Sequence, residues 1–251
     1  MASHSQMWAN PVYPVIAYLI AFMGSALGLA CTSRLRAVGL TAGRGWLAGG
    51  AISLGTGIWG MHFVAMLGYS VRDVTLHYDL LLTALSWVIA VVFVGVGMVL
   101  VARNSSWPSL LGAGLLSGLG IAGMHYLGMA AVLMPGTMRH NFSLVALSVV
   151  IAIVAATAAL WASLRITHAG ARTGAALVMG GAVCGMHYTA MLSVTSVNMT
   201  GGVAAGGVTA SAFIVPLIIG LTLIIFVVAV AVLINPVEDL VSMRARLGDQ
   251  G

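Results

Sequence analysis

Long apolar runs separated by short polar stretches dominate the sequence. Seven of these runs are long enough to cross the hydrocarbon of a bilayer as helices, which takes about 20 residues each. They lie near residues 12–32, 45–69, 79–102, 109–134, 142–164, 172–194 and 212–234. Backbone polar groups cannot stay unpaired in lipid, so runs of this length predict helices rather than strands. The pattern predicts an all-α integral membrane protein with seven transmembrane helices.

One eight-residue pattern occurs three times in this apolar background. The sequence reads WGMHFVAM at 59–66, AGMHYLGM at 122–129 and CGMHYTAM at 184–191. Its histidines, at positions 62, 125 and 187, are 63 and 62 residues apart, each toward the end of an even-numbered predicted helix. Self-similarity at a fixed period indicates a repeated structural unit. We expect three helical hairpins, with the seventh helix as a closing element.

Glycine occurs at two fixed positions before each of these histidines. The positions seven and two residues before the histidine hold Gly55 and Gly60, Gly118 and Gly123, and Gly180 and Gly185. Small residues let membrane helices approach closely. The two positions lie on nearly opposite sides of a helix, and we interpret both as packing surfaces.

The repeated histidines and methionines are the candidate chemical site. Three hairpins that run in the same direction place His62, His125 and His187 at one depth. Ionisable side chains inside a membrane usually face the bundle interior or a functional cavity. Methionines lie one residue before each histidine (Met61, Met124, Met186) and four residues after it (Met66, Met129, Met191). Imidazole and thioether together favour a soft ion, above all copper(I).

The two sets of methionines differ in what their spacing implies. A residue four positions after a histidine stacks on the same helix face, which favours metal ligation by the second set. The preceding methionines lie about 100° away from that face. For them, metal ligation and simple core packing both stay open.

Five further residues form a candidate accessory metal site. They are predicted on the same side of the membrane as the three histidines, in loops or at helix ends: His4, His77, His140, Met134 and Met138. Loop histidines are more often solvated than ligating. As a set, these side chains could line the path by which a metal ion reaches the membrane interior.

Charge predicts the orientation of the chain. The sequence holds no lysine, and the predicted loops after helices 1, 3 and 5, with the C-terminal tail, carry eight of its ten arginines. The positive-inside rule then places the N-terminus outside and the C-terminus in the cytoplasm. We expect an extracytoplasmic tail at 1–11, a membrane domain at 12–236 and a short cytoplasmic tail at 237–251. The net charge of +5 reports this topology and gives no reason to expect a nucleic-acid partner.

The GMHY pattern, with GMHF in the first copy, closely resembles the signature of the MHYT domain, a bacterial membrane sensor domain. Only the third copy spells MHYT in full, since Val64 and Leu127 replace the threonine at position 189. The resemblance implies seven helices in the bacterial inner membrane and a copper ion bound by Met61, His62, Met124, His125, Met186 and His187. It also implies that the domain senses a diatomic gas: oxygen, carbon monoxide or nitric oxide. Because the tail is short, we expect a separate cytoplasmic or membrane signalling partner.

Other functions fit the residues less well. A copper carrier, store or delivery protein would use the same soft ligands. Haem would need two of the histidines as axial ligands, and three ligands at equal depth fit a compact metal site better. An enzyme is not expected, because Asp79 is the only carboxylate near the hydrocarbon and such chemistry usually needs an acid or base beside the metal.

Overall fold

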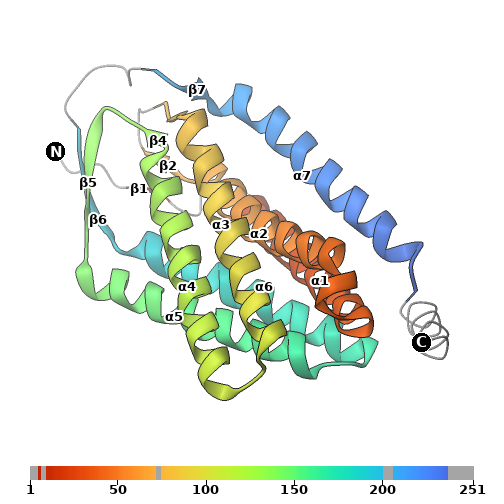
Figure 1. Ribbon diagram of the computed structural model, residues 1–251. Helices are drawn as coiled ribbons and strands as arrows, with labels where there is room; N and C mark the ends of the chain where they lie inside the picture. The colour runs from red at the N-terminus through yellow and green to blue at the C-terminus, as the bar shows by residue number, and fades with distance from the viewer. Residues whose placement is uncertain (1–4, 7–9, 72–74, 200–205, 237–251) are drawn as a thin grey trace, which may run out of the picture.

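The computed structural model describes the chain except residues 1–4, 7–9, 72–74, 200–205 and 237–251. Its described part contains seven long helices, and all seven are long and apolar enough to cross a membrane. They are α1 (Val12–Ala42), α2 (Arg44–Leu67), α3 (Leu80–Arg103), α4 (Trp107–Ala130), α5 (Phe142–Arg165), α6 (Ala169–Leu192) and α7 (Ala210–Leu233). The predicted fold class, an all-α membrane protein with seven helices, is confirmed (Figure 1).

Helix α1 is longer than the sequence predicted. The apolar run suggested an end near residue 32, but the helix continues to Ala42, with a break at Gly39, where φ is +82°. The extra turns are stabilised because Arg34 and Arg36 donate hydrogen bonds to backbone carbonyls of neighbouring segments. Hydropathy marks the part of a helix that lies in hydrocarbon, and it does not mark the helix end. The prediction of an end near residue 32 was therefore wrong.

The first six helices close into a ring in chain order, and α7 packs outside it against α1 and α2. Helices α2, α4 and α6 lie deeper than the helices that follow them. Their hydropathies of 1.3, 1.4 and 1.4 are below the values of 2.6, 2.5 and 3.1 for α3, α5 and α7. Lipid is as apolar as a leucine side chain, so large aliphatic side chains gain no hydrophobic free energy by burial between helices. They therefore cover the outside of the bundle, and small residues lie at the helix contacts.

The glycines seven residues before each histidine produce close helix contacts. A Cβ atom at Gly55 would lie 2.8 Å from the Cα atom of Val91 in α3, and one at Gly118 would lie 2.4 Å from the Cα atom of Ile153 in α5. At Gly180 the nearest atom is the backbone nitrogen of Phe22 in α1, 3.1 Å away. Each repeat therefore uses this glycine to contact the backbone of a neighbouring helix.

The glycines two residues before each histidine behave differently. Gly60 packs against Leu221 of α7, where a Cβ would lie 2.5 Å from the leucine side chain. At Gly123 and Gly185 a Cβ would meet no atom within 4 Å. The prediction of a second packing surface is confirmed at Gly60 and wrong at the other two, because α7 covers only the first repeat.

Short antiparallel strands join the helix ends on one side of the bundle, and the sequence analysis did not predict them. Strands β1 (Ser5–Gln6) and β2 (Ser70–Val71) pair, as do β5 (Gly136–His140) and β6 (Val194–Met199). A third sheet has the order β4 (Val132–Leu133), β3 (His77–Tyr78), β7 (Val208–Thr209). We call this side of the bundle the strand end.

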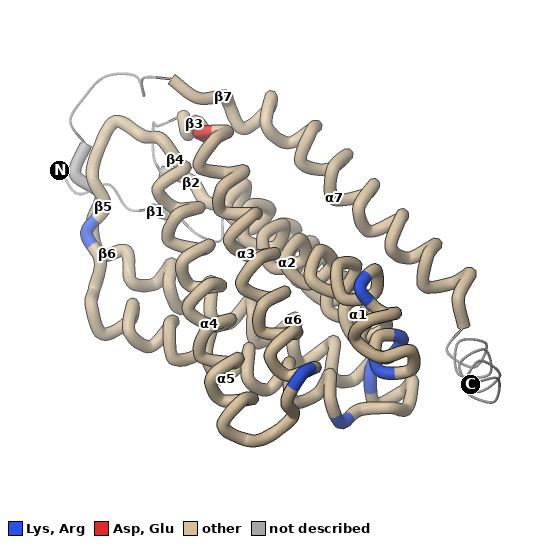
Figure 2. Tube along the Cα trace, viewed as in Figure 1, with Lys and Arg blue, Asp and Glu red and all other residues tan. Residues whose placement is uncertain are grey.

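Charge separates the two ends of the bundle (Figure 2). Of the arginines that the structure describes, Arg139 lies in β5 at the strand end, and the rest lie at the opposite end, which we call the arginine end. Its members are Arg34, Arg36, Arg44, Arg103, Arg165 and Arg172. The arginines thus gather at one end of the bundle, as the predicted loops after helices 1, 3 and 5 indicated. The orientation in the membrane stays a prediction.

Candidate metal centre

Three histidine side chains from three helices meet inside the bundle. The Nδ1 atom of His62 in α2 lies 3.1 Å from the Nδ1 atom of His187 in α6. The Nδ1 atom of His125 in α4 lies 3.1 Å from that of His62 and 3.3 Å from that of His187. The rings meet edge to face, with centroids 4.8–5.1 Å apart. The exposed fractions of the three residues are 0%, 1% and 1%, so bulk water does not reach the triad.

The repeat explains why the triad forms. Each histidine lies in the last two turns of an even-numbered helix, and these helices alternate with the odd-numbered ones around the ring. The internal repeat therefore brings three equivalent side chains to one level, although they are about 60 residues apart in the sequence.

The three nitrogens cannot satisfy one another by hydrogen bonds. A neutral imidazole carries one N–H, and a nitrogen that donates its proton cannot also accept one. At least two of the three Nδ1 atoms therefore face each other in the same protonation state, which is unfavourable for buried polar atoms. The Nε2 atoms of His62 and His125 are also buried, and no hydrogen-bond partner for them lies in the described part of the chain.

A metal ion would fit this arrangement. Nitrogens 3.1–3.3 Å apart surround a centre about 1.8 Å from each, close to the ~2.0 Å of a metal–imidazole bond. Within the described ranges, these histidines form the group of His, Cys, Asp and Glu side chains close enough to share an ion. A planar haem would not fit between nitrogens that lie in van der Waals contact.

The six methionines of the repeated motif are all buried. The side chains of Met61, Met66, Met124, Met129, Met186 and Met191 are 0–7% exposed. Met186 lines a cavity on the side of the triad toward the arginine end. Burial agrees with either role, so ligation by the thioether sulfurs stays a prediction.

The aromatic residue after each histidine takes a role that depends on its neighbours. Tyr126 pairs its hydroxyl with the Ser148 hydroxyl of α5 at 2.8 Å. Phe63, in the first copy, instead contacts the ring of Phe213 in α7, with centroids 5.6 Å apart. Phe213 in turn stacks on the ring of Tyr78, with ring centroids 4.6 Å apart. Phe63 therefore packs against aromatic rings. The departure from tyrosine in the first copy thus matches the position where α7 covers the bundle.

Tyr78 closes this aromatic cluster from the strand end. Burial, with a smaller contribution from Tyr13, raises the pKa of the Tyr78 hydroxyl to about 12. The ring therefore stays uncharged throughout the physiological pH range and adds no charge near the triad.

The candidate accessory residues do not join the triad. His77 lies in β3, with its Nδ1 atom buried and without a hydrogen-bond partner in the described part of the chain. His140 ends β5, and its Nδ1 atom lies 3.0 Å from the Ser193 hydroxyl. Met138 lies in β5 and Met134 lies between β4 and β5, both partly buried, and His4 lies outside the described residues. An accessory site stays a prediction.

Two features of the site were not found from the sequence. A Cβ atom at Gly128 would lie 2.5 Å from the Nε2 atom of His62, so this glycine leaves room for the ring. The signal was present, since the other two copies have alanine at this position (Ala65 and Ala190). The other feature is the contact of Phe63 with Phe213, and only the F-for-Y change in the first copy hinted at it.

Asp79 has a structural role in this fold. Its carboxylate accepts a hydrogen bond from the backbone N–H of Leu82 at 3.0 Å and caps the start of α3. It is the only acidic residue in the described part of the chain. The carboxylate of Asp79 thus serves a backbone N–H at the start of this helix.

Comparison with known proteins identifies the family. Residues 55–114 and 118–177 match the MHYT family, described as the bacterial signalling protein N terminal repeat. No solved structure matches the chain. Among curated proteins, the bifunctional diguanylate cyclase/cyclic di-GMP phosphodiesterase MucR of Pseudomonas aeruginosa is 38% identical over 244 residues, which cover 94% of this chain and 35% of MucR.

Two further relatives carry the same segment. The cyclic di-GMP phosphodiesterase NbdA of Pseudomonas aeruginosa is 40% identical over 72% of this chain and 24% of its own length. The signaling protein YkoW of Bacillus subtilis is 32% identical over 60% of this chain and 20% of its own. The chain thus spans about a third or less of each of these relatives. With its repeated histidine motif, its seven helices and these matches, the chain belongs to the MHYT family of membrane signalling proteins.

Proposed function

We propose that this protein is a non-enzymatic sensor in the bacterial inner membrane that binds one copper ion at His62, His125 and His187. The observation that carries the proposal is the convergence of three buried Nδ1 atoms that cannot satisfy one another. Copper(I) accepts imidazole and thioether ligands, and buried methionines one residue before and four residues after each histidine supply candidate sulfurs. When bound, copper would supply an open coordination position for oxygen, carbon monoxide or nitric oxide.

The protein's own residues would keep the site dry and rigid. The triad is buried. On the side of the strand end, Phe63 packs against Phe213, which stacks on Tyr78. Gly128 packs against the His62 ring. A shift of the His62 ring moves its chain neighbour Phe63, which contacts α7. Helix α7 runs from this contact at Phe213 to the Arg34 contact at Val232, so it offers a route for a signal toward the arginine end. We expect two packing arrangements of the helices in equilibrium. A gas ligand shifts this equilibrium only as far as its affinity differs between the two arrangements.

A cyclic di-GMP enzyme is the partner class that the relatives suggest. MucR and NbdA are named for such activities, and the chain is similar to a minor part of each. We propose that this membrane domain regulates an output of that kind, either in the same polypeptide or in a separate protein.

Infrared spectroscopy tests the sensor function directly. Protein reconstituted with copper(I) in lipid nanodiscs and treated with carbon monoxide should show one C–O stretching band. The band should be absent from a His125→Ala variant. Copper that binds without any band for carbon monoxide, and without a spectral response to nitric oxide or oxygen, would contradict gas sensing. Transfer of the copper across a vesicle membrane would instead favour a carrier.

A further inference from the structure

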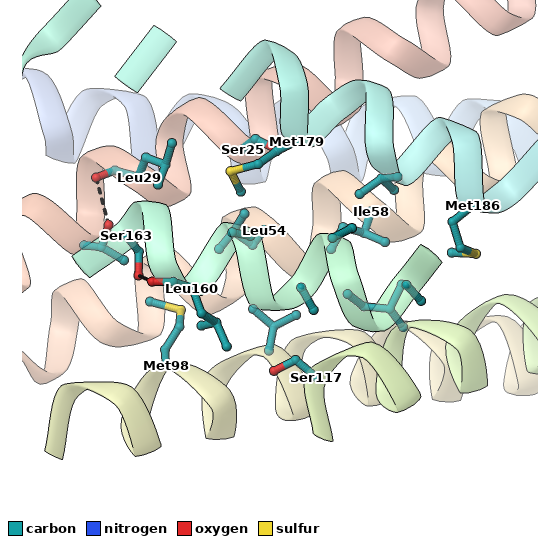
Figure 3. Close-up of a pocket in the computed structure, with 18 residues that line it drawn as sticks. Ser25, Leu29, Leu54, Ile58, Met98, Ser117, Leu160, Ser163, Met179 and Met186 are labelled. Atoms are coloured by element: carbon teal, nitrogen blue, oxygen red, sulfur yellow. Dashed lines mark hydrogen bonds between the residues drawn. The ribbon is translucent and has the colours of Figure 1, made fainter. Parts of the chain in front are cut away.

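A cavity lies among helices α1 to α6 (Figure 3). Along these helices, its lining residues lie between the level of the triad and the arginine end. Its volume is about 50 Å³. Its wall includes Ile58, Ile121 and Val183, each four residues before a histidine of the triad, and Met186, which directly precedes His187. Four residues are about one helical turn, so the cavity starts one turn from the candidate metal centre.

The wall of the cavity is apolar. Aliphatic side chains and methionines from α1 to α6 form most of it, and no charged side chain lines it. The hydroxyls of Thr32, Ser117 and Ser163 donate their hydrogens to the backbone carbonyls of Leu29, Phe93 and Leu160. A buried water needs two to four polar partners. Three of the four hydroxyls on the wall thus have acceptors for their hydrogens, and Ser25 carries the fourth. Since few polar groups remain for a buried water, the cavity favours an apolar occupant.

Helix α5 contributes four small side chains to the wall. They are Ala152, Ala155, Ala156 and Ala159. Ala155 and Ala159 are only partly buried, although they line the cavity. Most of α5 faces outward, toward the lipid in a membrane. Small apolar molecules dissolve in bilayer hydrocarbon and would meet this wall first.

We propose that this cavity is a binding site for one small apolar molecule, of the size of a diatomic gas, taken from the bilayer and held beside the triad. Dry apolar cavities of roughly 150 Å³ bind benzene or xenon, and a volume near 50 Å³ excludes benzene but admits a single xenon atom or a diatomic molecule. The proposal of a binding site depends only on the cavity and its apolar wall. Its assignment as a gas supply for the triad rests on the proposed function.

Xenon is the probe for the site, because it binds apolar cavities without any metal. Met98, Met179 and Met186 line the cavity, whereas Met23 is 43% exposed on α1. In metal-free protein labelled at the methionine methyl groups, xenon pressure should shift the resonances of the three lining methionines saturably. The Met23 resonance should change only linearly, as expected for xenon dissolved in lipid or detergent.

A matched pair of variants locates the binding. Ala156→Leu adds three carbon atoms to the cavity wall and should abolish the saturable shifts. Ala158→Leu, on the exposed face of the same helix, should leave them unchanged. If Ala156→Leu does not fold, Ala152→Val makes a smaller addition to the same wall. Absence of saturable shifts in the unmodified protein, or equal shifts in the filled variant, would overturn the proposal.

A second readout separates this inference from the proposed function. Ala156→Leu loaded with copper(I) should keep the copper content of the unmodified protein and take up carbon monoxide several-fold more slowly. An unchanged rate would overturn the role in gas supply. If the protein binds xenon normally but binds no copper, the proposed sensor function is wrong and the apolar binding site is still supported.

Discussion

The imidazole of His62 packs against Gly128, at a position where the other two repeats carry alanine. A Cβ atom there would lie 2.5 Å from Nε2 and 2.9 Å from Cδ2 of the ring. Metal sites depend on such supporting contacts, because they fix the direction in which a ligand nitrogen points. One glycine among three related positions thus lets the rings approach to 3.1 Å.

The variant Gly128→Ala should weaken copper(I) binding without unfolding the protein. The added methyl group must displace the His62 ring, and lost support around a metal ligand typically costs about 10–100-fold in affinity. Competition with a copper(I) chelator measures the effect. Gly123→Ala is the matched control on the same helix, because a Cβ there would meet no atom within 4 Å. Equal affinities for the two variants would contradict this role of Gly128.

At the scale of the element, α7 differs from the other helices. It packs mainly on α1 and α2, outside the ring, and it makes specific contacts near both of its ends. Near the strand end, Phe213 meets Phe63 and Tyr78. At the arginine end, the guanidinium of Arg34 donates hydrogen bonds to the carbonyl oxygens of Val232 and Asn235. Val232 lies in the last turn of the helix, where carbonyls lack internal donors, and Asn235 lies two residues beyond the helix end.

The variant Arg34→Met should loosen the end of α7. Hydrogen bonds from charged donors contribute about 1.5–3 kcal/mol each, so amide exchange at Ile234, whose N–H donates to Val230, should rise about tenfold or more. Hydrogen–deuterium exchange in nanodiscs measures it. Arg103→Met removes an exposed arginine from the last turn of α3 and should have no effect at Ile234. A similar rise in both variants would show that loss of charge, rather than loss of these bonds, is responsible.

The sequence predicted the helices well and the segments between them poorly. Hydropathy placed six of the seven helices with boundaries within about four residues, since the bilayer fixes their length. It could not predict the end of α1, where Arg34 and Arg36 stabilise helix outside the apolar run. It could not predict the short strands either, because their pairing joins loops that are distant in sequence, such as β3 with β7.

At the scale of the whole molecule, the internal repeat predicted more than any single motif. It indicated that His62, His125 and His187 lie at one depth, and the structure brings their Nδ1 atoms within 3.3 Å of one another. The repeat could not show that the first copy is special. Only packing reveals that α7 covers Gly60 and Phe63, while Gly123 and Gly185 face open space.

Copper analysis of the purified protein after anaerobic copper(I) reconstitution tests whether the histidine triad binds a metal ion. We expect one copper ion per chain, and none in the triple variant His62→Ala, His125→Ala, His187→Ala. The double variant His77→Ala, His140→Ala is the matched control and should keep the copper. Circular dichroism checks folding, and His125→Gln replaces the triple variant if that chain does not fold. An unmodified protein that binds no copper, or a triple variant that still binds one ion, would contradict the account.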